Sequence, residues 1–177
     1  MTLPDVIVIR GAPGAGKSEA AKCLAARLGR GARVEVDTLR SMIVPVTWTD
    51  QGEHIAVLAL AGSVVSGFLR MGHRPVIVVD TFSGDKLGKF LEDLGTANPG
   101  ATVRSFSLAP NRSALRARVE HRPDGEYKDL RVCEKLNEDV VRRLIPGELL
   151  IDNSNMTPEE SVDVILRACA GADVRVS

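Results

Sequence analysis

The sequence predicts an α/β fold in which a mostly parallel, five-stranded sheet lies between layers of helices. Short β-branched runs alternate with longer helical patterns along the chain, and this alternation is typical of parallel sheets with crossover helices. The runs are apolar almost throughout, as strands are when helices cover both faces of a sheet. With 177 residues and neither a repeat nor an evident linker, the chain is expected to form one domain, residues 1–177.

The individual elements follow from local patterns in chain order. The expected strands are 6–9, 34–36, 76–79, 102–108 and 149–151. The expected helices are 18–28, about 53–71, 86–94, 113–121, 130–144 and 158–170. The last has the clearest start, because Thr157 can cap it, Pro158 suits its first turn and Glu160 completes a capping box. Ligands of such folds bind at the carboxyl ends of the strands, so functional residues are expected there.

Composition narrows the class of protein. Lysine plus arginine equals aspartate plus glutamate at 23 each, and this balance argues against extensive wrapping of nucleic acid, which relies on an electropositive face. The cysteines form no CxxC pair or Cys/His cluster, so we expect reduced core residues and no zinc site at Cys23, Cys133 and Cys169. The N-terminus lacks a signal-peptide pattern, and the apolar stretch 55–69 is interrupted by glycine and serine and is too short for a bilayer. A cytoplasmic location is expected.

The most specific motif is GAPGAGKS at residues 11–18. It fits GxxxxGK[ST], the phosphate-binding loop, and stands between an expected strand and an expected helix. Backbone N–H groups of such a loop converge on phosphate oxygens, and the positive end of the helix faces the same point. Lys17 is expected to reach the β- and γ-phosphates, and the Ser18 hydroxyl to help hold Mg²⁺. The predicted site for ATP or GTP comprises Gly11, Ala12, Pro13, Gly14, Ala15, Gly16, Lys17, Ser18 and Glu19.

A second motif, Asp37-Thr38-Leu39-Arg40, follows the second expected strand. A carboxylate at that edge can accept a proton from an acceptor hydroxyl as it attacks the γ-phosphate, and we interpret Asp37 in this way. Arg40 is then expected to clamp an anionic or polar group of the acceptor. In the alternative interpretation Asp37 caps a short helix and Arg40 is a surface residue.

The third expected strand ends in an acid, Asp80, within VIVVDT at residues 76–81. This is the form of the Walker B element, whose aspartate orients Mg²⁺ directly or through water. In small kinases the same residue faces the acceptor in some cases, so Asp80 is a candidate for either role. A simple turn aspartate is the alternative.

Four arginines are concentrated in a helical segment: Arg112, Arg116, Arg118 and Arg122. Arginines on a mobile flap can neutralise the charge of a transferring phosphoryl group when the flap closes. Arg118 and Arg122 are four apart and are expected to share a helical face, and the turn at 124–127 suits a flap. We name residues 111–129 the lid and favour Arg118 and Arg122 as its phosphate-binding residues. A solvated basic helix is the alternative.

Together these residues resemble the small P-loop kinases of the adenylate-kinase-like class, in particular chloramphenicol phosphotransferase, zeta toxin and the kinase module of polynucleotide kinases. The resemblance also includes LLIDNSNMTPEES at residues 149–161, which is similar to the last strand, loop and helix of that class. It implies the sheet order 2-3-1-4-5, Asp37 as general base, and a loop near adenine at 153–155, with Asn155 as a candidate contact. In polynucleotide kinases the arginine of Asp-x-x-Arg binds the phosphate of the acceptor, so Arg40 hints at a phosphorylated acceptor.

The segment 41–72 is expected to form most of the acceptor side. It contains the only tryptophan, Trp48, which either stacks on a ring of the acceptor or lies in the core. The following helix is apolar almost all round, so we expect it to be buried or covered by a second subunit in a homodimer. Three histidines are expected to be ordinary surface or capping residues: His54, His73 and His121.

The sequence thus predicts an ATP- and Mg²⁺-dependent kinase that phosphorylates a hydroxyl of a small molecule. One alternative is a polynucleotide 5′-hydroxyl kinase, which predicts a basic groove leading to Arg40. The other is a nucleotide-binding regulatory module without an acceptor, which predicts slow hydrolysis and no pocket beside Asp37.

Overall fold

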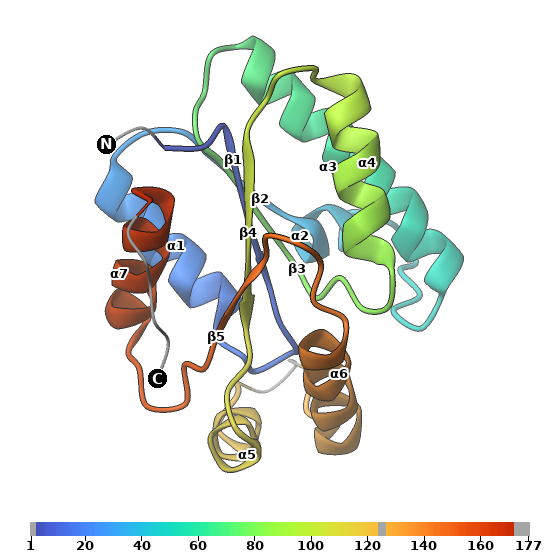
Figure 1. Cartoon of the computed structure of the whole chain (residues 1–177). Helices are drawn as coiled ribbons and strands as arrows, with labels where there is room; N and C mark the ends of the chain where they lie inside the picture. Colours follow the sequence, from blue (N-terminus) through green and yellow to red (C-terminus); the bar gives the residue numbers. More distant parts are fainter. Residues whose placement is uncertain (1–2, 124–126, 172–177) are drawn as a thin grey trace.

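The computed structural model describes residues 3–123 and 127–171 and has a five-stranded parallel sheet at its centre (Figure 1). The strands are β1 (Val6–Arg10), β2 (Ala32–Glu35), β3 (Val76–Asp80), β4 (Val103–Leu108) and β5 (Leu149–Ile151). Every pair is parallel and the order is β2-β3-β1-β4-β5. The predicted fold class and strand order are confirmed.

Helices cover both faces of the sheet, as Figure 1 shows. On one face lie α1 (Lys17–Leu28) and α7 (Pro158–Cys169), and on the other lie α3 (Gln51–Arg70) and α4 (Lys86–Ala97). The helices α5 (Arg112–Glu120) and α6 (Leu130–Arg142) lie beyond the carboxyl ends of the strands. The edge at which ligands bind in such folds therefore lies between the sheet and this helix pair.

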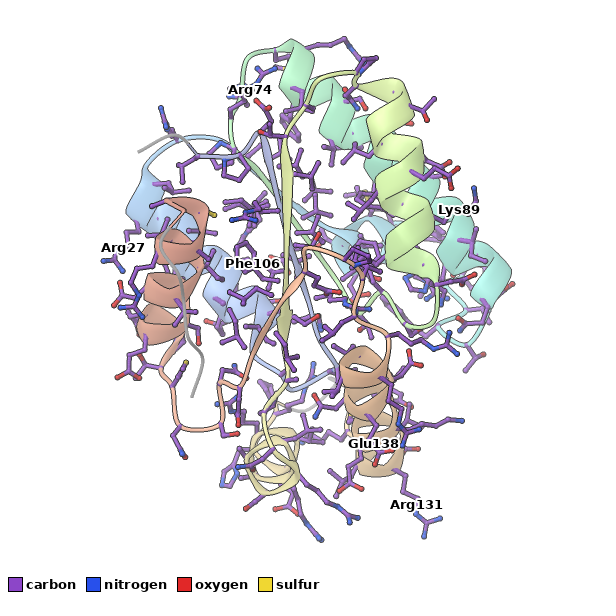
Figure 2. The ribbon with its side chains drawn as sticks, in the orientation of Figure 1. Arg27, Arg74, Lys89, Phe106, Arg131 and Glu138 are labelled. Atoms are coloured by element: carbon purple, nitrogen blue, oxygen red, sulfur yellow. The ribbon has the colours of Figure 1, made fainter. Side chains whose placement is uncertain are left out.

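Successive side chains of a strand point to opposite faces of the sheet, and this divides the core into two clusters. In β1, Val6 and Val8 pack with residues of α3 and α4, whereas Ile7 and Ile9 pack with residues of α1 and α7. Figure 2 shows Phe106 of the second cluster in the middle of the molecule. This double coverage explains why the strands are apolar throughout. The cysteines are free thiols, of which Cys133 is buried and the other two are half-buried.

One element, a short helix after β2, was expected only in the alternative interpretation of Asp37. The second strand ends at Glu35, and Val36–Arg40 form a short helix, α2, so Val36 is not a strand residue. Val36 is fully buried. Burial of an apolar residue is expected both at the last position of a strand and at the first position of a helix, so the sequence pattern does not distinguish the two. As a result Asp37 lies in the first turn of a helix.

The helix α3 is longer than its apolar stretch suggested. It has 20 residues, and the side chain of Asp50 caps it by accepting from the N–H of Glu53 at 3.0 Å. By length and composition it is the one helix in the described part of the chain that could cross a membrane, so the expectation that this stretch is too short is wrong. This is weak evidence for a membrane span, because one face of α3, including Val57, Leu58 and Val65, packs against the sheet.

Candidate active site

Residues 11–16 join β1 to α1 at the carboxyl end of the central strand, and Lys17 and Ser18 begin the helix. Gly14 and Gly16 have φ angles of 86° and 92°, a left-handed conformation that favours glycine. The N–H of Ala15 donates to the carbonyl of Ala12 at 3.0 Å and tightens the turn. Gly16 is the N-cap of α1, and no side chain caps the helix. The first N–H groups of any helix lack intrahelical partners, and here no capping side chain satisfies them, which suits an anionic ligand.

The ammonium group of Lys17 lies over this loop, where Nζ donates to the carbonyl of Ala12 at 3.3 Å. Burial lowers the pKa of Lys17, and the charges of Asp37 and Asp80 act in the opposite direction. Asp80 is the last residue of β3, and Asp37 lies in the helix that follows β2, the neighbour of β3 in the sheet. The structure therefore brings the three residues predicted from separate motifs within electrostatic reach of one another.

Asp37 is exposed to solvent, in the first turn of α2. Neighbouring protein atoms nevertheless desolvate its carboxylate, and this desolvation together with the negative charge of Asp80 raises the pKa of Asp37. The charge of Lys17 opposes the shift without cancelling it. A carboxylate with a raised pKa accepts a proton more readily than an ordinary aspartate, which is the property of a general base.

Asp80, the last residue of β3, is only 2% exposed and has a partner for each oxygen. Its Oδ1 lies 3.2 Å from Nε2 of His54, and its Oδ2 accepts from the N–H of Phe82 at 2.7 Å. Burial alone would raise the pKa of Asp80, but the hydrogen bond and charge of His54, the N–H of Phe82 and the charge of Lys17 outweigh it and lower the pKa. Asp80 is therefore held in its charged form.

The prediction that the histidines are surface or capping residues is wrong for His54. This residue is 7% exposed and contacts Asp80 from α3. Its position in the sequence carries a signal, because His54 stands three, four and seven residues before the buried Val57, Leu58 and Ala61, so it shares their helical face. His73 and His121 are exposed, as expected.

Ser18 points toward a carboxylate that the sequence analysis did not single out. Its hydroxyl donates to Oε2 of Glu35, the last residue of β2, at 3.0 Å. Oxygen atoms of Ser18, Glu35 and Asp80 are of the kind that Mg²⁺ prefers, and this metal commonly binds one or two carboxylates together with substrate phosphates. Among the residues that the structure describes, no group of three or more His, Cys, Asp or Glu forms a metal site by itself. Ser18 and Glu35 thus offer neighbouring oxygen atoms of the kind that suits Mg²⁺.

Arg40 is buried beside Asp37 and has protein partners for its guanidinium. It is 4% exposed, and its Nε lies 3.0 Å from Oε1 of Glu53. Another nitrogen donates to the carbonyls of Thr47 and Asp50 at 2.7 and 2.8 Å. The interpretation of Arg40 as a surface residue is therefore wrong, and its hydrogen bonds hold the loop at 41–50.

Trp48 lies against Arg40 and is half-exposed. The guanidinium carbon of Arg40 is 5.3 Å from the centre of the Trp48 ring, a cation–π arrangement. Because 49% of Trp48 remains exposed, the interpretation of this tryptophan as a core residue is wrong. One part of the ring is available to a ligand.

The helix α5 of the lid lies directly against the phosphate-binding loop. Arg118 donates to the carbonyls of Asn153 and Ala15 at 2.6 and 3.4 Å. Burial lowers the pKa of Arg118, and the charge of Asp152 opposes this. A Cβ atom added to Gly14 would meet Cγ2 of Val119 at 2.7 Å, which shows how closely the two segments pack.

Arg122 lies beyond the end of α5 at Glu120, so the prediction that Arg118 and Arg122 share a helical face is wrong. The charge of Arg122 still reaches Lys17, where it adds to the larger effect of burial in lowering the pKa of that lysine. The two remaining arginines are exposed and form ion pairs, Arg112 with Glu134 and Arg116 with Glu120. Residues 124–126 of the predicted turn lie outside the described residues.

The predicted adenine loop after β5 provides a buried asparagine. The Nδ2 of Asn153 donates to the carbonyl of Ala15 at 2.8 Å. Its Oδ1 is buried without a hydrogen-bond partner among the described residues, and such an orphaned acceptor suits a donor group of a bound nucleotide. Asn155 and Glu19 are exposed, and Glu19 pairs with Lys22.

The chain belongs to the AAA domain family AAA_33, whose sequence profile matches residues 6–146. Its structure is similar to that of a gluconokinase from Sinorhizobium meliloti 1021, with a TM-score of 0.68, 22% identity, and coverage of 97% of this chain and 94% of that chain. It is also similar to shikimate kinase from Acinetobacter baumannii, in complex with shikimate, with a TM-score of 0.62, 17% identity, and coverage of 98% and 97%. A chain of the Pnkp1/Rnl/Hen1 RNA repair complex matches with a TM-score of 0.62 and 18% identity over 80% of this chain and 45% of that one.

No curated protein matches the sequence. The family match and the shared fold confirm the resemblance to small P-loop kinases. At these identities the solved structures show the fold alone, so the reaction and its acceptor have to be argued from the site.

Proposed function

We propose that this protein is an ATP- and Mg²⁺-dependent kinase that transfers the γ-phosphate to a hydroxyl of a small molecule. The observation that carries the proposal is the meeting of Lys17, Asp37 and Asp80 at the uncapped N-terminus of α1. A loop that only binds a nucleotide has no need of a carboxylate with a raised pKa beside it. A phosphotransferase needs one to accept the proton of the acceptor hydroxyl.

Each residue of the site has a role in this reaction. The backbone N–H groups of residues 11–18 bind phosphate oxygens, and the ammonium of Lys17 neutralises their charge. Ser18, Glu35 and Asp80 would hold Mg²⁺, which when bound offsets further phosphate charge. Asp37 orients the acceptor hydroxyl and takes its proton. Arg118 and Arg122 bring positive charge from the lid to the same place.

The experiment is a transfer assay with γ-labelled ATP, Mg²⁺ and a panel of nucleosides, sugars, antibiotics and 5′-hydroxyl oligonucleotides. We expect label on a small hydroxyl compound with the wild-type protein and almost none with Asp37→Asn, because the amide cannot accept a proton. Calorimetric titration with ATP and Mg²⁺ is the control, since Asp37→Asn should still bind the nucleotide. Equal transfer by both proteins would contradict the role of Asp37.

The same assay separates the two alternatives. Salt-sensitive transfer to oligonucleotides, and to nothing smaller, supports a polynucleotide kinase. Hydrolysis of ATP without any labelled product supports a regulatory module. A cytoplasmic location and a homodimer remain part of the proposal, and sedimentation of the purified chain tests the homodimer.

A further inference from the structure

We infer that the acceptor is a hydroxyl compound without an anionic group and with an apolar or aromatic part, which contacts Trp48 and the loop at 41–50. The inference rests on the proposed function and names the class of compound that the same site takes. It comes from three features of the segment between β2 and α3: the partners of Arg40, the balance of charge, and the exposed apolar side chains.

First, the cation expected to bind an anionic acceptor is already neutralised. Arg40 pairs with Glu53 at 3.0 Å and donates to two backbone carbonyls. An acceptor phosphate that took Nε and Nη2 would have to displace the Glu53 carboxylate and both carbonyls from a side chain that is 4% exposed. Breaking such a buried pair is strongly unfavourable. Arg40 therefore positions the loop, and its charge is already offset by Glu53.

Second, the remaining charge on the acceptor side is negative. Residues 35–54 contain four carboxylates, of which Glu53 pairs with Arg40 and Glu35 with Arg33 at 3.3 Å. That leaves the carboxylates of Asp37 and Asp50. Asp80 adds another at the end of β3, and the charge of the Lys17 ammonium acts on both Asp37 and Asp80. The nearby cation of α4, Lys86, is bound to Gln51 and Ser83 at 2.7 and 3.2 Å. Like charges repel, so an anionic acceptor is disfavoured beside Asp37.

Third, the loop exposes apolar side chains next to the proposed base. Met42 is 69% exposed, Val44 91% and Trp48 49%, all within seven residues of one another. Single exposed apolar residues are common, but a cluster on one loop indicates a contact surface. Trp48 is held against Arg40, and Arg40 is one helical turn from Asp37. An apolar or aromatic part of the acceptor would cover this ring while its hydroxyl approaches Asp37.

The test uses matched pairs of hydroxyl compounds that differ by one anionic group. Thymidine is compared with thymidine 3′-monophosphate, and 4-(hydroxymethyl)benzamide with 4-(hydroxymethyl)benzoate, in the γ-labelled ATP assay with the full chain. We expect the uncharged member to have a kcat/KM at least about tenfold higher. Transfer that favours the anionic members contradicts this inference and leaves the kinase proposal intact. Transfer to no compound of these pairs or of the wider panel counts against the kinase proposal itself.

Trp48 supplies a second, direct readout, because it is the only tryptophan of the chain. The uncharged members should change the fluorescence of Trp48 when they bind. Their anionic counterparts, at the same concentrations, should leave that fluorescence unchanged. Trp48→Ala should raise the KM for the acceptor about tenfold with the KM for ATP unchanged, and Trp48→Phe should restore most of the affinity. If Trp48→Ala alters neither constant, the loop is not the acceptor surface.

Two methionines provide a matched comparison. Met42 and Met71 are 69% and 70% exposed, but Met42 follows α2 at the proposed site, whereas Met71 follows α3 at the opposite edge of the sheet. Met42→Ala should raise the KM for the acceptor, and Met71→Ala should leave it unchanged. Equal effects of the two substitutions would contradict the proposed surface.

Discussion

The guanidinium of Arg10 and the carboxylate of Glu148 form an ion pair in the interior, with 2.6 Å between Nε and Oε1 and no exposure of either side chain. Arg10 is the last residue of β1, directly before the phosphate-binding loop. It also donates to the carbonyls of Phe82 and Arg143 at 3.2 and 2.7 Å. One side chain therefore links the nucleotide loop, the segment after β3 and the end of α6.

The first prediction is that Arg10→Met lowers the free energy of unfolding by about 3–5 kcal/mol, because it leaves the Glu148 carboxylate buried without its counter-charge. Urea denaturation measures the change. The double variant Arg10→Met with Glu148→Leu should recover much of the loss, since it removes both charges. The control is Asp93→Ala, which breaks the exposed pair with Lys89 and should cost less than about 1 kcal/mol. A loss from Arg10→Met no larger than from Asp93→Ala would contradict the prediction.

The fold and the outline of the site could be predicted because they depend on local patterns. Apolar runs, glycines and caps identify the elements, and the carboxyl ends of parallel strands must share one edge, which places Asp37 and Asp80 near the P-loop. The side-chain partners could not be predicted. His54 and Asp80 are 26 residues apart, Ser18 and Glu35 are 17 apart, and Arg10 and Glu148 are 138 apart. Such pairs depend on how the elements pack, which periodicity does not encode.

Arg40 illustrates the same limit. The motif Asp-x-x-Arg fixes the spacing of two charged residues on a short helix but not the partner of the arginine. That partner is Glu53, thirteen residues further along the chain, and with it Arg40 holds the loop at 41–50. A motif thus predicts where a charged residue lies better than which residue it pairs with.

The second prediction is that Asp37→Asn loses activity and gains stability. Desolvation and Asp80 raise the pKa of Asp37 above its ordinary value of 3.8. Between the ordinary pKa and the raised pKa, the folded state binds more protons than the unfolded chain. The free energy of unfolding therefore falls as pH rises through this range. The amide does not titrate and avoids this cost at pH 7.

Urea denaturation of both proteins between about pH 4 and pH 7 tests this. The wild type should lose stability relative to Asp37→Asn as pH rises, and phosphoryl transfer by the variant should fall by about 10²–10⁴-fold. Parallel stability curves would show that the carboxylate is not perturbed in the folded state.

The third prediction concerns His54, which fixes Oδ1 of Asp80 at 3.2 Å. His54→Ala leaves that buried oxygen unpaired, while the N–H of Phe82 still holds Oδ2. We expect the Mg²⁺ concentration for half-maximal transfer to rise by about 10–100-fold, because outer residues that orient a metal-binding carboxylate have effects of this size. His54→Gln, which keeps a donor, should recover part of the loss. His73→Ala is the control, since His73 is exposed and should leave the Mg²⁺ dependence unchanged.

The last prediction compares two glycines that differ in backbone conformation and surroundings. Gly14 has a φ of 86°, and an added Cβ would lie 2.7 Å from Cγ2 of Val119, so Gly14→Ala should destabilise the protein by more than about 1 kcal/mol and abolish ATP binding. Gly95 lies inside α4 with nothing within 4 Å of an added Cβ, and Gly95→Ala should stabilise it by about 0.5–1 kcal/mol. Thermal denaturation and calorimetric titration with ATP measure both effects. Both variants add the same methyl group, so opposite signs would trace the difference to the conformation and packing of the loop. Unchanged ATP binding by Gly14→Ala would show that ATP binding does not depend on the left-handed conformation of Gly14.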